Sequence, residues 1–421
     1  MRAAFHTLGC KVNQYDSQAM LELFERAGYE AGSFDEPCDV YVINTCTVTG
    51  TGDKKSLQAV RRAQRLNPAA QIVVCGCLAQ RDGEKLLAET GARLILGTAR
   101  RQEVVTLLEE AVRADTAICA VTDVRHASFE PLLITRHEGR TRATLKIQEG
   151  CDRFCTYCII PYVRGGIRTR PVADVAAEAA RLAAAGYREI VLTGIELTEY
   201  GKDLADRPTL NDLIRLSDEC GVERLRLGSL DPRFADEAFA QTCAQSRSLC
   251  HQFHLSLQAG SDTVLARMNR RYTAAEYLRN ADRLRAYMPD AAITTDVIAG
   301  FPGETEAEHQ ETAAFLRQVG FARIHVFPYS RRPGTKAASM PGQLTRQEKA
   351  RRARELIALG DELEKVFIDR QIGTLQQVLM EEDGTGYTGN YVRVRCPGPA
   401  GELVAVRIVG RKDTIAEGES I

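Results

Sequence analysis

The stretch RATLKIQEGCDRFCTYC, residues 142–158, decides the fold and the chemistry of the central part of the chain. Seven residues with a β-strand pattern come first, and three cysteines follow in the spacing CxxxCxxC. A structural zinc site takes four ligands, and a disulfide bond would leave one of the three thiols over. The cysteines therefore indicate a metal site with an open coordination position; a zinc site completed by a distant histidine is the alternative.

The composition is that of a soluble protein. The chain has 421 residues, 26% of them charged, and a formal net charge of −1. It is long enough for two or three domains and is not a globally basic nucleic-acid binder. No apolar run approaches the roughly 18 residues of a membrane span, and the N-terminus lacks the apolar stretch of a signal peptide. We expect a cytoplasmic protein that binds no membrane, in which 13 cysteines indicate metal or redox chemistry rather than disulfide bonds.

Six strand patterns, separated by helical patterns, run through the central part of the chain. They are RATLKIQ, REIVLTG, RLRLGS, HQFHLSLQ, ITTDVIAGF and RIHVFPYS, which begin at residues 142, 188, 224, 251, 293 and 323. This alternation predicts an open, partial (β/α)6 barrel, whose chemistry lies at the carboxyl ends of the strands. The cysteine loop follows the first strand and so has that location.

The first 115 residues also alternate apolar strand patterns with helical ones, which predicts a doubly wound α/β domain with a parallel sheet. Cys10, Cys46 and Cys77 each follow one of these strand patterns. Because parallel strands end at one edge of a sheet, we expect the three cysteines to meet there and to form a second metal site. Cys75 competes with Cys77 for the third position, since strand alternation directs both to one face.

Short β patterns with glycine-rich turns follow a long charged helix pattern at residues 345–370, and they predict a small β-barrel. We therefore place three domains at residues 1–115, 136–366 and 370–421. The last has six basic and seven acidic residues, counted from Arg370, so strong attraction to phosphate across it is not expected. A local basic face could still form, from Arg393, Arg395, Arg407, Arg411 and Lys412. The helix before it could extend this face, or be an ordinary solvated helix.

A [4Fe–4S] cluster explains why the cysteines come in threes. Its four irons each take a ligand, so three cysteines leave one iron open for a substrate or cofactor. CxxxCxxC with an aromatic residue before its last cysteine, here Tyr157, is the signature of radical S-adenosylmethionine enzymes. In those enzymes the open iron binds the amino and carboxylate groups of S-adenosylmethionine.

The ordered motifs resemble the radical S-adenosylmethionine methylthiotransferases over essentially the whole chain. The motifs are TLGCKVNQYDS, INTCTV and CGCLAQ near the N-terminus, then GCDRFCTYCIIPYVRGGIRTR, HLSLQAGSDTVLARMNRRY and DVIAGFPGET. The C-terminal part is similar to the TRAM domain, a β-barrel with which many RNA-modifying enzymes hold RNA. Within the family, LTGIELTEYG, RMNRRY and HVFPYSRRPGTKAASMP are most similar to the enzymes acting on N6-threonylcarbamoyladenosine in tRNA.

This resemblance implies S-adenosylmethionine as cofactor and two [4Fe–4S] clusters, whose ligands are Cys10, Cys46 and Cys77 for one and Cys151, Cys155 and Cys158 for the other. It implies a radical reaction that replaces the C2–H of the adenine 3′ of the anticodon by a methylthio group. The expected partners are the anticodon loop of tRNA, an unidentified electron donor and an unidentified sulfur donor. Since the C2–H is not acidic, acid–base catalysis has little to act on, and we assign no catalytic side chain.

The candidates for binding S-adenosylmethionine are Tyr157, Gly194, Glu196, Gln258 and Gly300. The glycines would allow close approach of the cofactor or would be ordinary turn glycines, and the two polar residues lie just past strand ends. Arg164, Arg168 and Arg170 follow the cysteine loop. They would orient the cofactor or an RNA phosphate, or form a solvated face.

Two other functions fit parts of the sequence. A methylthiotransferase that modifies an aspartate of a ribosomal protein would share all three domains, and a near-neutral barrel suits a basic protein partner. A non-catalytic iron–sulfur RNA-binding protein or sensor would need neither open irons nor a cofactor cradle. The two cysteine triads and the glycine motifs argue against this last function.

Overall fold

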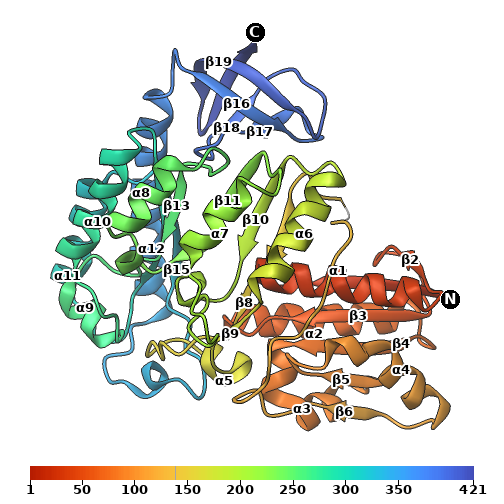
Figure 1. Cartoon of the computed structure of the whole chain (residues 1–421). Coiled ribbons are helices and arrows are strands. Elements are labelled where there is room, and N and C mark those ends of the chain that lie inside the picture. The colour runs from red at the N-terminus through yellow and green to blue at the C-terminus, as the bar shows by residue number, and fades with distance from the viewer. Residues whose placement is uncertain (138) are drawn as a thin grey trace. The chain divides into compact units, whose positions relative to one another are not determined.

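The structure is a computed structural model that describes residues 1–137 and 139–421. The chain divides into two compact units, whose elements are labelled in Figure 1. The first unit contains Met1–Glu138, Lys146–Arg170 and Ser330–Thr335, and the second contains Gly139–Leu145, Pro171–Tyr329 and Lys336–Ile421. The CxxxCxxC loop thus belongs to the same unit as the N-terminal cysteines.

The first unit is built on a parallel sheet with the strand order β2-β1-β3-β4-β5-β6. Its strands are β1 (Arg2–Thr7), β2 (Glu30–Gly32), β3 (Val40–Thr45), β4 (Gln71–Gly76), β5 (Leu94–Leu96) and β6 (Ile118–Ala120). Its helices are α1 (Lys11–Arg26), α2 (Gly50–Leu66), α3 (Cys77–Thr90), η1 (Arg101–Glu103) and α4 (Val104–Arg113).

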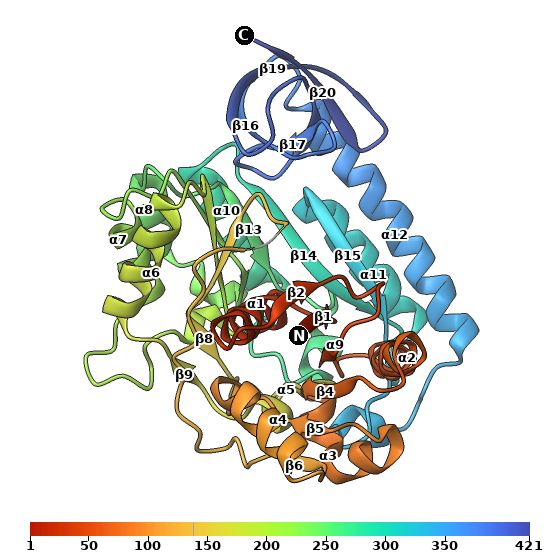
Figure 2. The same cartoon turned by 90° about the vertical axis from the view of Figure 1, so that its right-hand side faces the viewer.

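Helices cover both faces of this sheet, as the red and orange elements of Figures 1 and 2 show. Phe24 of α1 and Leu108 of α4 belong to the core on one face. Val60 of α2 and Leu86 of α3 belong to the core on the other. The doubly wound α/β fold that the alternating patterns predict is therefore confirmed.

A short antiparallel ladder closes the CxxxCxxC loop. Its strands are β8 (Gln148–Glu149) and β9 (Arg168–Thr169), and the short helix α5 (Ile160–Arg164) lies between them in sequence. Gly150 is required at the start of the loop, because a Cβ atom there would lie 1.7 Å from the carbonyl oxygen of Gly166. The three cysteines are thus held on a loop whose two ends are paired.

The second unit contains the central strand series, arranged as β11-β10-β7 and β12-β13-β14-β15. The strands are β7 (Ala143–Lys146), β10 (Glu189–Thr193), β11 (Arg224–Leu227), β12 (Ser229–Leu230), β13 (Gln252–Leu255), β14 (Ala292–Ala299) and β15 (Arg323–Pro328). Only Gly228 separates β11 from β12, so the two sheets continue one another. The predicted partial barrel is confirmed, with its third strand interrupted at this glycine.

Helices alternate with these strands, as the sequence predicts. They are α6 (Val172–Ala184), η2 (Leu197–Glu199), α7 (Leu210–Ser217), η3 (Pro232–Phe234), α8 (Glu237–Gln245), α9 (Asp262–Arg267), α10 (Ala274–Tyr287), α11 (Glu306–Val319), η4 (Lys336–Ser339) and α12 (Arg346–Asp369). Capping boxes begin three of them, at Thr209, Thr273 and Thr305. In each, a threonine and an acidic residue three positions later bond each other's backbone N–H groups, which fixes where the helix starts.

The last five strands close into the small barrel that the sequence predicts, in the order β16-β17-β18-β20-β19. They are β16 (Leu375–Met380), β17 (Thr385–Tyr387), β18 (Arg393–Arg395), β19 (Leu403–Lys412) and β20 (Ile415–Ser420). Val378, Val394 and Val406 form its core with Ile368, the second-last residue of α12. Figure 2 shows α12 running beside β15 to the barrel.

Buried arginines attach this barrel to the starts of β10 and β11. The carboxylate of Glu189 pairs with Arg226 at 2.7 Å, Arg224 at 3.0 Å and Arg142 at 3.1 Å. Arg226 also donates to the carbonyl oxygens of Thr388 and Gly389 in the barrel. Burial alone would raise the pKa of Glu189, but the guanidinium groups lower it to about 2. The barrel is therefore attached at the strand ends opposite to those where the chemistry of this fold lies.

Within residues 1–137 and 139–421, no helix combines the length and the apolar character needed to cross a membrane.

Candidate metal centres

The first unit brings Cys10, Cys46 and Cys77 together at the carboxyl ends of β1, β3 and β4, which are neighbours in its sheet. Cys10 is the N-cap residue of α1, Cys46 directly follows β3, and Cys77 is the first residue of α3. Burial is the main cause that raises the pKa of Cys46, and the charges of Cys77 and Cys10 raise it further; the charge of Cys10 also raises the pKa of Cys77. Gly9 lies against Cys46, since a Cβ atom at Gly9 would be 2.8 Å from the Cys46 Cβ. The sheet topology alone thus brings together three thiols whose first and last members lie 67 positions apart in the sequence.

Cys75 lies apart from this group. It is fully buried in β4 and belongs to the apolar core on the α1 and α4 side of the sheet, and burial raises its pKa to about 12. Gly76 has a φ of +91°, so the strand ends there and alternation does not carry through to Cys77. The expectation that both thiols point to one face is wrong, and the geometry favours Cys77 over Cys75.

Arg164, the last residue of α5, is fully buried beside Cys77. Its Nε donates to the Cys77 Sγ over 3.2 Å. Cys77 also packs against Ile159 and Val163, which precede Arg164. Burial raises the pKa of Cys77, and the nearby guanidinium opposes that rise. Burial likewise raises the pKa of Cys46 to about 11. The site offers these two thiols a buried cation when they lose their protons.

Arg164 is one member of a buried network of charges. The cations are Arg101, Lys146, Arg164 and Arg168, and the carboxylates are Asp16, Glu130 and Glu149. Four cations against three carboxylates leave this described network with one surplus positive charge beside the thiols. Because a buried charge is costly unless it is paired, the surplus fits an anionic group at the thiols. Soft thiolate donors with no carboxylate among them suit an iron–sulfur cluster or zinc, so the residues fit the predicted cluster.

The second triad is local. In its loop the N–H of Cys158 donates to the carbonyl oxygen of Cys155 over 2.9 Å, and the N–H of Cys151 donates to Gly165 over 3.1 Å. Phe154 has a φ of +48°, an uncommon left-handed conformation that bends the loop between the first two cysteines. Tyr157 is half-buried. Three thiols within eight residues, on a loop with paired ends, fit the predicted cluster with one open iron.

The other cofactor candidates follow strand ends in the second unit. Gly194 and Glu196 follow β10, and Glu196 accepts a hydrogen bond from Thr198 over 2.5 Å. Gln258 has a φ of +73° and pairs through its backbone with β14. Such strain in a non-glycine residue is typical of functional sites. Gly300 follows β14, and a Cβ atom there would lie 2.4 Å from the Lys349 Cγ. The approach of α12 therefore suffices to explain this glycine.

Comparison with known proteins gives the family. Residues 2–97 match the family described as Uncharacterized protein family UPF0004, and residues 145–316 match the Radical SAM superfamily. The threonylcarbamoyladenosine tRNA methylthiotransferase MtaB of Bacillus subtilis is 40% identical, over 99% of this chain and 96% of its own length. MtaB of Aquifex aeolicus is 36% identical, over 97% of this chain and 100% of its own. A tRNA-2-methylthio-N(6)-dimethylallyladenosine synthase of Pelotomaculum thermopropionicum is 34% identical, over 96% of this chain and 94% of its own.

This chain belongs to the radical S-adenosylmethionine methylthiotransferases. Membership confirms the resemblance of the motifs, and it implies a [4Fe–4S] cluster and S-adenosylmethionine. A non-catalytic iron–sulfur protein is excluded, because the relatives that cover the whole chain are enzymes.

Solved structures of other radical enzymes share the fold of this methylthiotransferase. The methyltransferase TsrM of Kitasatospora setae aligns with a TM-score of 0.57 at 16% identity, covering 80% of this chain and 75% of its own. The enzyme OxsB aligns with a TM-score of 0.55 at 13% identity, covering 88% of this chain and 56% of its own. At these identities the likeness concerns the fold alone.

The three arginines after the cysteine loop do not form a solvated face in this methylthiotransferase. Arg164, Arg168 and Arg170 are all buried. Their partners, such as Asp16 in α1, could not be identified from the motif, because these residues lie far away along the chain. One signal was available: Lys146, within the strand pattern RATLKIQ, and Asp16, on the buried side of a helix, are charged residues in positions that favour apolar ones.

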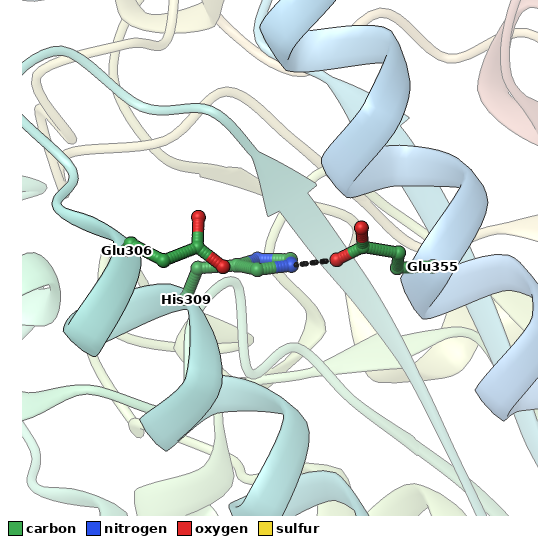
Figure 3. A group of neighbouring side chains, drawn as sticks. All are labelled: Glu306, His309 and Glu355. Atoms are coloured by element: carbon green, nitrogen blue, oxygen red, sulfur yellow. Dashed lines mark hydrogen bonds and ion pairs between the residues drawn. The ribbon is translucent and has the colours of Figure 1, made fainter.

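A group of metal-binding side chain types that the sequence analysis missed lies between α11 and α12 (Figure 3). Glu306 and His309 are three residues apart on α11, and Glu355 of α12 is 2.9 Å from the His309 Nε2. Both carboxylates already bind Arg351, at 2.6 Å and 2.7 Å. We interpret the group as an ion-pair network that joins two helices of the methylthiotransferase, because a guanidinium occupies the place where a cation would be needed.

The expected basic face of the barrel is largely neutralised. Arg393 pairs with Asp383 at 2.7 Å, and Arg411 pairs with Asp369 at 2.6 Å. Arg407 lies opposite Glu419 in the β19–β20 ladder, and Arg395 lies opposite Glu417 in the β18–β20 ladder. Acidic residues thus accompany four of the five predicted basic residues.

Proposed function

We propose that this enzyme inserts a methylthio group at C2 of N6-threonylcarbamoyladenosine beside the anticodon of tRNA, with two [4Fe–4S] clusters. The observation that carries the proposal is the meeting of Cys10, Cys46 and Cys77 around a buried arginine. The chemistry of a radical S-adenosylmethionine enzyme needs one cysteine triad, so a second triad requires a second task. Delivery of sulfur is the task that a methylthiotransferase adds.

In this proposal Cys151, Cys155 and Cys158 hold the first cluster, and Tyr157, Gly194, Glu196, Gln258 and Gly300 contact S-adenosylmethionine. When bound, this pair supplies a carbon-centred radical able to remove a hydrogen atom that no base can abstract. The loop ladder of β8 and β9 keeps the three thiols in register. The positive φ of Gln258 fixes a polar side chain just past the end of β13.

Cys10, Cys46 and Cys77 hold the second cluster, and its open iron is the place where a sulfur or methylated sulfur species binds. The chain's own contribution there is a group of three thiols, exposed at Cys10, half-buried at Cys46 and buried at Cys77, with buried cations behind it. Asn13 joins two of the ligand segments, because its Nδ2 donates to the carbonyl oxygens of Leu8, at 2.7 Å, and Thr45, at 3.0 Å. An electron donor and a sulfur donor, both unidentified, complete the reaction.

The substrate assignment is supported by the names of the relatives and by the type of barrel. MtaB relatives at 40% and 36% identity carry threonylcarbamoyladenosine in their names. An anticodon loop offers unstacked bases, whereas a helix does not. Since Arg393 and Arg411 of the barrel are paired with acids, we expect affinity for tRNA to fall only modestly as salt rises.

The same pairing favours one alternative substrate, an aspartate of a ribosomal protein, because a neutral barrel suits a basic protein as well as RNA. The test supplies reconstituted enzyme in parallel with tRNA bearing N6-threonylcarbamoyladenosine, tRNA lacking it, and ribosomal protein. Mass spectrometry should find the 2-methylthio nucleoside only in the first reaction, and a Cys77→Ala enzyme should produce none. Modification of the protein and of neither tRNA would replace the proposal by the alternative.

A further inference from the structure

Arg164 has a geometry that a purely structural ion pair would not need. Its Nη1 donates to the carboxylate of Glu149 and its Nη2 to the Oδ1 of Asn13. These two contacts fix the plane of the guanidinium, and its remaining Nε–H then points to the Cys77 Sγ, 3.2 Å away. All three nitrogen atoms of the guanidinium thus donate a hydrogen bond, and one of these bonds goes to a thiol.

The partner of Arg164 on the other side is itself tied to the triad. Asn13 bonds the carbonyl oxygen of Leu8, two residues before Cys10, and that of Thr45, directly before Cys46. The backbone carbonyl oxygen of Asn13 accepts a hydrogen bond from the Asn44 Nδ2 over 3.0 Å. Arg164 and Asn13 together therefore connect the segments that carry all three thiols.

Hydrogen bonds to the sulfur atoms of a cluster, and positive charge near it, stabilise the reduced form, which carries one more negative charge. The effect is large where water is excluded, and Arg164 has no exposed surface. Arg164 also lies six residues after Cys158, at the end of the short helix that follows the other triad. A cation from the helix that follows the CxxxCxxC loop thus hydrogen-bonds Cys77, a proposed ligand of the other cluster.

We propose that Arg164, oriented by Asn13 and Glu149, hydrogen-bonds the Cys77 thiolate and raises the reduction potential of the second cluster. This inference rests on the proposed function, because it requires a cluster on Cys10, Cys46 and Cys77. Arg164 is a positioning residue in this account: it contacts a ligand of the cluster and not the substrate.

The test isolates the second cluster in the full chain by replacing Cys151, Cys155 and Cys158 with alanine. Potentiometric titration followed by electron paramagnetic resonance then compares Arg164→Gln, Arg164→Lys and Arg168→Gln in that background. Arg168 is the matched control, since it is also buried and lies 3.9 Å from Glu149, and it donates a hydrogen bond to the Val124 carbonyl oxygen. Arg164→Gln should move the potential to more negative values, Arg164→Lys should restore part of the shift, and Arg168→Gln should shift it least.

A second measurement has its main result in protein that keeps Arg164, and that result does not depend on whether variants at position 164 fold. Protein labelled with guanidino-15N arginine should show a 15N hyperfine coupling to the reduced second cluster in pulsed resonance. The coupling should persist in Arg168→Gln and disappear in Arg164→Lys. Iron bound with no such coupling, or with the same potential in Arg164→Gln, would overturn the role of Arg164 alone. Absence of iron from the alanine background would show that no second cluster forms independently of the first, and the inference would fall with it.

Discussion

The two cysteine triads each offer three thiols, but they are built in different ways. Cys151, Cys155 and Cys158 lie within eight residues, on one loop whose ends pair as β8 and β9. Cys10, Cys46 and Cys77 come from three strand ends and meet because β1, β3 and β4 are neighbours in a parallel sheet. The first site depends on a loop, and the second depends on a whole fold.

The difference extends to what surrounds the thiols. The dispersed triad has a buried cation on Cys77 and a hydrogen-bonded frame around its strand ends. That frame includes Thr45, whose hydroxyl donates to the carbonyl oxygen of Cys75 and accepts from the N–H of Leu78. We infer that the local triad is specialised for an exchangeable cofactor on its open iron, and that the dispersed triad is specialised for a fixed environment. Substitutions should therefore affect the two sites independently.

The largest effect is expected from the local triad. Cys155→Ala should reduce formation of 5′-deoxyadenosine from S-adenosylmethionine to background, because an incomplete cluster no longer offers a properly held open iron. With all three cysteines of this loop replaced by alanine, about four iron atoms per chain should remain, those of the second cluster. Iron analysis and chromatography of the nucleoside products measure both. Loss of all iron would show that the sites are not independent.

Cys77→Ala should have a more selective effect. The second cluster should be lost, cleavage of S-adenosylmethionine should continue, and no methylthio product should form. The matched control is Cys75→Ala, two residues away, whose thiol lies in the apolar core. That control should keep both clusters and lose about 1 kcal/mol of the free energy of unfolding, the usual cost of a small core truncation. The reverse pattern of iron loss would make Cys75 the ligand.

The contrast between a local and a dispersed triad also decides how much of each site can be predicted from the sequence. The local triad could be predicted in full, because eight consecutive residues carry both ligand type and spacing. The dispersed triad could be predicted from strand order, because apolar periodicity locates strands and parallel strands end at one edge. The partner of Cys77 could not be predicted, because Arg164 is 87 positions away and nothing in a sequence pattern aligns them.

Two further limits have equally physical causes. The choice between Cys75 and Cys77 depended on one glycine, since Gly76 ends the strand with a positive φ and breaks the alternation on which the prediction relied. The basic face of the barrel was predicted from single strands. Its neutralisation comes from other strands, as where Glu419 of β20 lies opposite Arg407. Cross-strand partners of this kind depend on register, which short β patterns do not specify.

Gly9→Ala tests whether the dispersed triad depends on close packing. A Cβ atom at this position would lie 2.8 Å from the Cys46 Cβ and 2.9 Å from its Sγ. The substitution should displace Cys46 and remove most of the iron of the second cluster, without reducing the iron of the first. The matched control is Gly28→Ala: both glycines have a positive φ, +98° and +88°, but Gly28 has no atom within 4 Å of the added Cβ. Each should cost about 1–3 kcal/mol of stability through backbone strain, and only Gly9→Ala should lose iron.

The smallest effect is expected in the second unit, which holds neither triad, at the ion-pair network of Figure 3. Burial lowers the pKa of His309, but Glu304 and Glu355 outweigh it and raise the value above the usual one. The carboxylate oxygens lie 3.6 Å from Nδ1 and 2.9 Å from Nε2. Two cations also belong to this network: Arg351 pairs with Glu306 and Glu355, and Arg352 pairs with Glu304 and Glu306. A protonated His309 therefore joins α11 to α12.

The sign of the pH dependence follows from the raised pKa. Since the folded protein binds this proton more tightly than the unfolded chain, the stabilisation is fully present below the ordinary histidine pKa of about 6.5 and is lost as pH rises through the folded value. Because Glu355 is partly exposed, the pH-dependent part should be at most about 1 kcal/mol. His309→Gln should thus lower the free energy of unfolding more at pH 6 than at pH 8.5, measured by urea denaturation. Its lost packing is independent of pH and cancels between the two conditions. Iron content should not change at either pH; a loss of iron from one triad would mean that this helix pair supports that site, and the contrast between the triads would have to include it.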